Sequence, residues 1–286
     1  MIGSYLERRP SPALSGVVRT IWVHRTGDAP YVQRHLPTGG VELHVPLGGE
    51  PIVAGPLTAH WFEPIPPRTT IVGVRFQPGA APPLPVMLDE LVDQRVPLAD
   101  LWGGRAARLA ESMVEARGRP DRIEGAVAVL ENALLDEFRA AQHLDRLVRE
   151  AVTVLMPWRP VGVGAVAAHL ALSESQLRRR SLQAVGMSPK VLQRTLRFQG
   201  FLALAQAGAQ ATGRRGEDGI AGLAVEAGYS DQAHFSRECA RLTGLTPRQL
   251  LHGEVERCAC GHDHSASYLP FLAGRAASLR SVPPAR

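Results

Sequence analysis

The sequence lacks the features of membrane and secreted proteins. No apolar run approaches the roughly 18 residues that a membrane span requires. The first residues do not show the basic and then apolar pattern of a secretory signal. The three cysteines, Cys239, Cys258 and Cys260, are an odd number clustered late in the chain and do not form a disulfide framework. We therefore expect a cytoplasmic protein with no membrane partner.

Sequence motifs of catalysis are also missing. We find no nucleophile elbow, phosphate-binding loop or carboxylate pair that rises above chance. We therefore do not expect an enzyme. The 286 residues, 45% hydrophobic and 21% charged, are enough for two globular domains.

Positive charge is concentrated in the second half of the chain. Residues 1–142 carry 14 arginines and 16 acidic residues, whereas residues 143–257 carry 15 basic and 10 acidic residues. Residues 258–286 add three arginines and one aspartate. An excess of basic residues is typical of a surface that binds phosphates, although a charged stretch is more often a solvated face.

Residues 1–142 are expected to form a β-rich domain with a helical extension. Short β-branched runs separated by Pro and Gly clusters predict strands; they are Val17–Val23, Val41–Leu47 and Thr70–Phe76. A helical period follows from Val86 and is strongest over Ile123–Phe138. The apolar stripe of that helix fits either a dimer contact or the core of its own domain, and the domain boundary is placed near Gln142.

An internal repeat lies in the basic half. Leu172–Pro189 aligns with Ser230–Pro247, 58 positions later. The matching pairs are Ser173 with Asp231, Leu177 with Phe235, Arg179 with Arg237, Gly186 with Gly244, Ser188 with Thr246 and Pro189 with Pro247. Ser and Asp favour helix starts and Gly favours the position after a helix. Each copy follows a short small-residue helix, so each predicts a helix-turn-helix.

The helical period gives the bounds of this second domain, residues 143–257. The expected helices are Leu144–Met156, Gly162–Leu170, Ser173–Val185, Pro189 to about Ala207, Ile220–Ala227 and Gln232–Leu242. The third and the last of these are the reading helices of the two units. The long helix between the units would link them rigidly.

The same period separates an inner from an outer face on each reading helix. Leu177 and Phe235 point inward. The candidate DNA-binding residues are Ser175, Gln176, Arg178 and Arg179 in the first unit and Gln232, Ala233, Ser236 and Arg237 in the second. Arginine donates paired hydrogen bonds to guanine. Reading helices roughly 34 Å apart would enter successive major grooves on one side of double-stranded DNA. A helical bundle with Arg-rich solvent faces would not require the second copy.

The stretch GYSDQAHFSRECARLTGLTPRQL, from Gly228 to Leu250, resembles the signature of AraC/XylS-family transcription regulators. The upstream stretch LSESQLRRRSLQAVGMSP is similar to the first helix-turn-helix of that family. The resemblance covers about 110 residues, from near His143 to Leu251, and implies a domain that controls transcription from promoter-proximal sites. RNA polymerase is then a candidate partner. The family usually has a large aromatic residue where this chain has Ser181 and Cys239, so we expect different packing beneath the reading helices.

The N-terminal half is similar to an uncharacterised β-rich domain found ahead of such DNA-binding regions. The stretches that carry the likeness are RHLPTGGVELHVPLGG, VAGPLT, IVGVRFQPGAA and VPLADLWG. In position it corresponds to the cupin-like ligand-sensing domains of the family. The resemblance implies, by analogy, a sensor for a small-molecule effector or a dimerisation domain.

The tail, residues 258–286, fits two descriptions. Cys258, Cys260, His262 and His264 alternate, and in an extended segment their side chains project to one side. Thiolate and imidazole suit zinc or copper, but the spacing matches no standard zinc finger. The tail is thus either a metal site or a poorly ordered segment, and we expect poor order because Pro, Ser and Ala are frequent.

The N-terminal half holds weaker candidate ligands. His35, Glu42, His44 and His60 have the residue types of a cupin metal site, although no His-x-His pair is present. A small-molecule pocket is a second interpretation; its candidate residues are Trp22, Trp61, Phe62 and Arg75, with Arg75 holding an anion. Ordinary structural histidines and core aromatics explain both groups equally well.

Together these patterns predict an α+β chain, with a β-rich cupin-like domain and its helical extension followed by an all-α domain with two helix-turn-helix units. The predicted function is sequence-specific DNA-binding regulation by a protein that responds to a small molecule, with a homodimer left open. Alternatives are a regulator that senses metal through its Cys/His tail, a cupin-like enzyme joined to DNA-binding units, and a DNA-repair protein that accepts an alkyl group on a late cysteine.

Overall fold

A six-stranded antiparallel sheet forms the centre of the N-terminal half. The computed structural model describes residues 3–117, 123–140, 144–158, 161–212, 219–252 and 264–280. In spatial order the sheet consists of β1 (Ser4–Arg8), β2 (Val18–Arg25), β7 (Thr70–Phe76), β4 (Glu42–Pro46), β5 (Ile52–Ala54) and β8 (Arg95–Pro97). A separate antiparallel pair is formed by β3 (Tyr31–His35) and β6 (Trp61–Ile65). The β-rich N-terminal domain is thereby confirmed.

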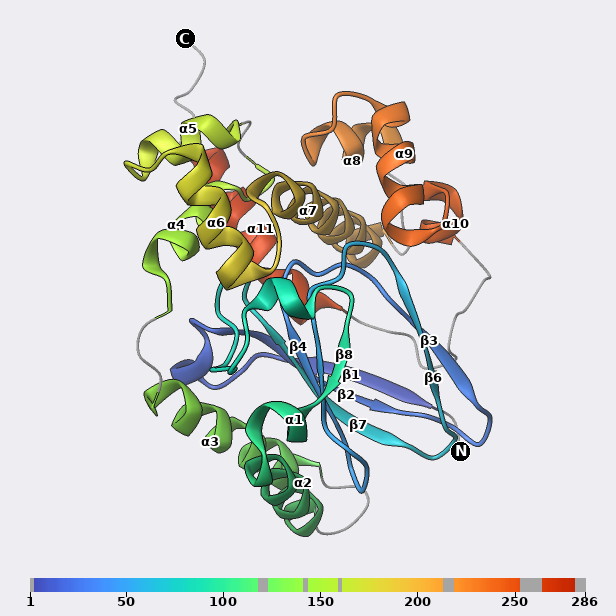
Figure 1. The fold of residues 1–286 in the computed structure, drawn as a ribbon. Coiled ribbons are helices and arrows are strands. Elements are labelled where there is room, and N and C mark those ends of the chain that lie inside the picture. Colours follow the sequence, from blue (N-terminus) through green and yellow to red (C-terminus); the bar gives the residue numbers. More distant parts are fainter. Residues whose placement is uncertain are drawn as a thin grey trace.

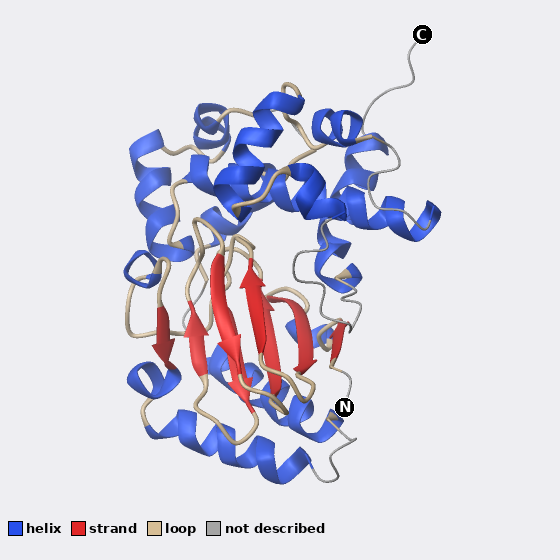
Figure 2. Cartoon of the chain, turned by 90° about the vertical axis from the view of Figure 1, so that its right-hand side faces the viewer, coloured by secondary structure: helices blue, strands red, loops and turns tan. Residues whose placement is uncertain are grey.

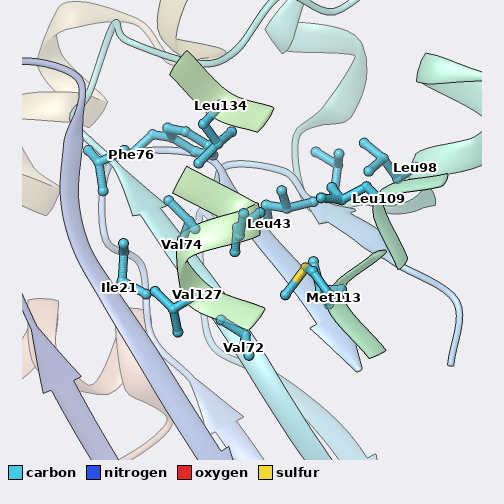
Figure 3. Packing of buried hydrophobic residues seen from close by; sticks show 14 of the residues in the cluster. Ile21, Leu43, Val72, Val74, Phe76, Leu98, Leu109, Met113, Val127 and Leu134 are labelled. Carbon is cyan, nitrogen blue, oxygen red and sulfur yellow. The ribbon is translucent and has the colours of Figure 1, made fainter. Parts of the chain in front are cut away.

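One face of the large sheet is apolar and carries the core of this domain. Successive residues of a strand point to opposite faces, so Val72 and Val74 of β7 lie on the apolar face together with Leu43 of β4 (Figure 3). Helices cover this face: α1 (Leu98–Trp102), α2 (Gly104–Arg117) and α3 (Glu124–Ala140). Short 3-10 turns lie at Pro12–Leu14 and Leu88–Leu91.

The apolar stripe of α3 belongs to this core. Ala126, Val127, Leu130 and Leu134 are fully buried against the sheet and α2. The helix expected at Ile123–Phe138 therefore uses its apolar face within its own domain. The alternative, in which this face forms a dimer contact, is wrong for these four residues.

The C-terminal half consists of helices whose order agrees with the expected one. They are α4 (Arg146–Val154), α5 (Val163–His169), α6 (Glu174–Val185), α7 (Pro189–Thr212), α8 (Ile220–Glu226), α9 (Gln232–Thr243) and α10 (Pro247–His252). The reading helices are α6 and α9. Helix α4 ends two residues earlier than expected, because Leu155 already closes its last turn.

The expectation of a poorly ordered tail is wrong for residues 264–280. Helix α11 (Ser265–Arg280) packs against α7 and the strands β1 and β2 (Figure 1). Phe271 and Ser267 are only 2% exposed. The small-residue composition hid this helix, because a few large side chains supply its contacts and Pro270 lies inside it.

The elements stack in three layers, with the strands between two layers of helices (Figure 2). Helices α1–α3 cover one side, and the helices of the C-terminal half cover the other (Figure 1). Helix α7 contributes to the two apolar clusters of this half, with Leu192 and Leu196 in one and Phe198 and Phe201 in the other. Within the described ranges, no helix has both the length and the apolar character to cross a membrane.

Candidate functional site

The first helix-turn-helix is built by local sequence signals. Ser173 caps α6 by accepting a hydrogen bond from the Gln176 amide at 3.2 Å, and the Gln176 side chain accepts one from the Ser173 amide at 2.8 Å. This reciprocal capping box fixes the start of the helix. Leu177 is fully buried, as expected. Gly186 ends the helix with a φ of 77°, a left-handed conformation that glycine adopts without steric cost.

The second helix-turn-helix repeats this construction. Asp231 caps α9 by accepting a hydrogen bond from the His234 amide at 2.6 Å. Phe235 is fully buried, and Gly244 ends the helix with a φ of 71°. The turn before the cap is one residue longer than in the first unit: the αL residue and the cap are Ala171 and Ser173 there, but Gly228 and Asp231 here. The offset of 58 therefore holds from the cap onward.

The position of the missing aromatic residue has the same role in both units. The Ser181 hydroxyl donates to the Met187 carbonyl at 2.6 Å. The Cys239 thiol, 58 residues later, lies 3.3 Å from the Leu245 carbonyl as a weak donor. Both side chains are buried and join the reading helix to the backbone that follows its terminal glycine. The expected difference in packing is therefore a polar contact that closes each unit.

Seven of the eight predicted DNA-binding residues are exposed in the structure, and Ser236 is half-buried. Two have additional structural roles. The side-chain oxygen of Gln176 is part of the capping box, and the Ser236 hydroxyl donates to the Gln232 carbonyl at 2.8 Å. Arg178, Arg179 and Arg237 keep exposed guanidinium groups, so the side chains most suited to guanine are accessible on both reading helices.

Helix α7 joins the two units as a continuous element. Its 24 residues correspond to about 36 Å of helix axis, comparable to the roughly 34 Å of one DNA turn. Arg194 of α7 binds the Glu238 carboxylate of α9 through two nitrogens, at 2.7 and 2.5 Å. This pair holds the second reading helix to the connecting helix.

The interior between the two sheets is polar. Trp22, His24, His44 and Arg75 lie on the face of the large sheet opposite α2 and α3. Gly73 makes room for Trp22, since a Cβ atom on Gly73 would lie 1.9 Å from the indole. The pair β3–β6 closes over this face.

Arg75 is neutralised by carboxylates of the protein itself. Its guanidinium lies 2.5 Å from Glu7 Oε1 and 3.0 Å from Glu42 Oε1. Burial alone would raise the pKa of Glu7 and of Glu42, but Arg75 overcomes this and holds both well below the usual range. The hypothesis that Arg75 holds an anionic ligand is therefore wrong. The proposed pocket wall also differs, because Trp61 and Phe62 are 40% and 42% exposed.

The histidines considered for a metal site separate into two places. His35 and His44 lie together in the polar interior, and Glu63 joins them. Glu42 contacts His44 from behind at 3.4 Å. His60 lies elsewhere, against Phe62. Sequence reasoning missed Glu63, although its place in β6 between Trp61 and Ile65 gave a weak signal for an inward-facing side chain.

Of the candidate tail ligands, Cys258, Cys260 and His262 lie outside the described residues. His264 is described, and its Nδ1 lies 2.9 Å from Glu7 Oε1. Cys239 is also unsuited to accept an alkyl group, because it is fully buried and burial raises the pKa of its thiol to about 11. The thiol therefore stays protonated and a weak nucleophile at neutral pH.

The N-terminal domain contacts the C-terminal end of each reading helix. A Cβ atom on Gly186 would lie 2.7 Å from the Leu88 carbonyl, so the end of α6 packs tightly against that 3-10 turn. At the end of α9, Arg34 donates to the Thr243 carbonyl at 2.5 Å and stacks on Phe62. The β-rich domain is thus in a position to set the orientation of both reading helices.

A buried arginine ties the layers together. Arg19 of β2 donates to the Ser267 carbonyl of α11 at 2.6 Å, to the Thr38 carbonyl at 3.1 Å and to Gln199 Oε1 of α7 at 2.7 Å. Gln199 in turn donates to the Pro37 carbonyl at 2.8 Å. Burial lowers the pKa of Arg19 to about 10, so it remains charged at neutral pH.

Two capped helix-turn-helix units on one connecting helix define a bipartite DNA-binding domain. Residues 166–253 match a family model described as a helix-turn-helix domain, which confirms the AraC-type assignment. Residues 6–97 match a model described as a domain of unknown function, DUF6597. The chain is therefore a DNA-binding transcription regulator with an AraC-type helix-turn-helix domain and an N-terminal domain of uncharacterised role.

Solved structures of ToxT from Vibrio cholerae show a distant likeness. The apo form is 13% identical, with 87% of this chain and 97% of that chain covered and a TM-score of 0.41. A form with a bound unsaturated fatty acid is 11% identical, with 90% and 96% covered and a TM-score of 0.41. No match was found among curated proteins. Values this low leave the ligand of this chain to its own geometry.

Proposed function

We propose that the protein binds a specific DNA sequence by placing α6 and α9 in two successive major grooves of double-stranded DNA. The observation that carries this proposal is the repetition of an exposed arginine, Arg179 and Arg237, at the same position after the caps of the two reading helices. Each guanidinium can donate two parallel hydrogen bonds to guanine O6 and N7.

The experiment starts from a genome-wide binding map that supplies a natural site. Binding of Arg179→Ala and Arg237→Ala to that site is then measured by fluorescence anisotropy. Each change is expected to weaken specific binding by roughly 1–3 kcal/mol. Arg139→Ala is the matched control, because Arg139 is an exposed arginine on α3, in the other domain. Unchanged affinity and footprint in both reading-helix variants would contradict the assigned faces.

Salt dependence gives a second measurement for the same proposal. Arginine contacts to phosphate release counterions, so the logarithm of the binding constant should fall linearly with the logarithm of the salt concentration. The slope should be about −0.9 for each phosphate contacted. A slope near zero for the natural site would contradict a basic DNA-binding surface.

We infer a small-molecule effector as the signal. A cavity of about 340 Å³ lies between α4, α7 and α11 and is lined mainly by apolar side chains, among them Met156, Trp158, Leu196 and Phe271. Its volume is within the range of small-ligand sites, and it adjoins Arg19, which contacts α7. Native mass spectrometry of the purified protein tests the inference, and a copurified small molecule should be lost when Gly274→Leu fills the cavity.

RNA polymerase and a second copy of the chain are the further partners of this proposal. A regulator that acts near promoters works by contacting the polymerase, and two copies would lengthen the DNA sequence that is read. Sedimentation of the protein with and without its DNA site measures the number of copies bound. Pull-down of purified polymerase on promoter DNA measures the second contact.

A further inference from the structure

Three strands bring metal-ligating atoms together in the polar interior between the two sheets. His35 from β3, His44 from β4 and Glu63 from β6 have ligating atoms that all lie within 4.8 Å of one another. Glu63 Oε2 is 2.8 Å from His35 Nε2 and 3.8 Å from His44 Nδ1. Ligands of one zinc-like ion, at bond lengths near 2.1 Å, are about 3.0–3.4 Å apart. Small side-chain rotations would therefore place all three around one ion.

These atoms are buried without hydrogen bonds. The side chains of His35 and His44 are 10% and 2% exposed. Neither His35 Nε2, His44 Nδ1 nor Glu63 Oε2 makes a hydrogen bond among the described residues, and the short contact between His35 and Glu63 lacks hydrogen-bond geometry. Buried polar atoms nearly always have a partner, so three unsatisfied atoms at one point require one.

The other ring nitrogen of His44 faces a carboxylate. His44 Nε2 lies 3.4 Å from Glu42 Oε2, and Arg75 holds the second oxygen of Glu42 at 3.0 Å. A proton on Nε2, donated toward Glu42, leaves Nδ1 with a lone pair directed at the cluster. Histidines that bind metal ions are commonly held by a carboxylate in this way.

The size of the space selects the kind of ligand. The cavity at the cluster has a volume of about 20 Å³. One water molecule needs roughly 10–15 Å³ by this kind of measure, so the cavity accommodates an ion with at most a water and excludes an organic effector. Three buried carboxylates, on Glu7, Glu42 and Glu63, face the two guanidinium groups of Arg75 and Arg95, which leaves one net negative charge.

We propose that His35, His44 and Glu63 bind a single divalent transition-metal ion. Two imidazole nitrogens and one carboxylate oxygen are the ligands of zinc, iron(II), manganese and cobalt sites that retain an open position. Calcium and magnesium prefer oxygen ligands alone. The site is separate from the tail residues Cys258 and Cys260.

The ion would stabilise the β3–β6 pair on the large sheet, since its ligands come from both. Arg34, which holds the end of α9, precedes His35 in β3. Metal binding is thus expected to raise the melting temperature of the whole chain.

The test uses the full-length, tag-free protein after removal of metal by a chelator. Cobalt(II) is the probe, because its visible absorption reports nitrogen and oxygen ligands and its titration gives the stoichiometry. One equivalent is expected to bind, to be displaced by zinc and to raise the melting temperature, whereas magnesium should do neither. Glu63→Gln, nearly identical in shape, should weaken cobalt binding at least tenfold, and so should His35→Gln if Glu63→Gln fails to fold.

Two matched controls separate this site from other ligands. His169→Gln removes an exposed histidine on α5, and Cys258→Ser with Cys260→Ser removes the tail thiols; both variants should still bind one equivalent. The proposal is overturned if the wild type binds no cobalt. It is equally overturned if binding survives in both Glu63→Gln and His35→Gln, or is lost only in the tail variant.

Discussion

Ser181 and Cys239 show how one side chain closes a helix-turn-helix. Both occupy a position where a bulky aromatic residue was expected, and both point at a carbonyl six residues further along the chain. The sequence alone exposed the substitution but not the contact, because a bend of the backbone at a glycine brings the carbonyl back to the helix. Burial of Leu177 and Phe235, in contrast, followed from the helical period alone.

Removal of the Ser181 hydroxyl should destabilise the first unit. Ser181→Ala loses a buried hydrogen bond and is expected to lower the free energy of unfolding by about 1–3 kcal/mol. Ser181→Cys should cost less, since the second unit uses a thiol at this position. Urea unfolding followed by circular dichroism measures both variants. Equal stability of Ser181→Ala and wild type would show that the contact is dispensable.

Glu7 carries a pH dependence of stability. Its folded pKa is held below the ordinary value of 4.5, so it stabilises the fold fully above about pH 4.5 and progressively less as the pH falls below that value. The free energy of unfolding should therefore decrease between pH 5 and pH 3, where roughly the unfolded state gains protons first. Glu7→Gln should be less stable at pH 7 and show a flatter slope.

The control for this prediction is Glu115→Gln, since Glu115 is exposed on α2. Chemical unfolding at a series of pH values from 7 downward measures the slope for all three proteins. A slope in Glu7→Gln as steep as in wild type would assign the acid sensitivity to other carboxylates, of which Glu42 and Glu63 are the candidates.

Whole helices were foreseen where the sequence is periodic and capped. The bounds of α5, α6, α8 and α9 agree with expectation within about one residue, because caps and terminal glycines are local signals. Strands β1, β5, β6 and β8 were not foreseen, since three to five residues carry little pattern. Helix α11 was missed because its stability comes from contacts with distant elements rather than from its own composition.

Loss of α11 should destabilise the chain as a whole. A chain that ends at Asp263 lacks His264 and Ser267, which both bind Glu7, as well as the carbonyl that accepts from Arg19. Buried charges left without partners cost several kcal/mol, so we expect the melting temperature to fall by at least about 5 °C. A chain that ends at Arg280 should melt like wild type. Differential scanning fluorimetry compares the three lengths.

At the scale of the molecule, the sequence predicted two domains but not their arrangement. Charge separation and the repeat identified which half binds DNA. The contacts of Leu88 with Gly186 and of Arg34 with Thr243 join residues far apart in the chain, and no local pattern announces them. The cluster of His35, His44 and Glu63 was partly seen for the same reason: residue types were visible, but their convergence depends on strand pairing.

Arg19 should control the cooperativity between the two halves. Arg19→Gln shortens the side chain and removes donors to Ser267 and Thr38. The halves are then expected to unfold in two separable steps, whereas the wild type unfolds in one. Calorimetry measures the transitions, with Arg139→Ala as an exposed control. A single transition in Arg19→Gln would place the coupling elsewhere, for example at Arg34.

The return of α11 to β1 has a consequence for biosynthesis. Glu7 is among the first residues to leave the ribosome, and His264 and Ser267, which complete its environment, are among the last. The sheet must therefore wait with a buried carboxylate and Arg75 incompletely satisfied until translation is almost finished. A chain cut short by a premature stop keeps both reading helices yet never receives this final piece, so quality control can recognise it before it occupies a promoter.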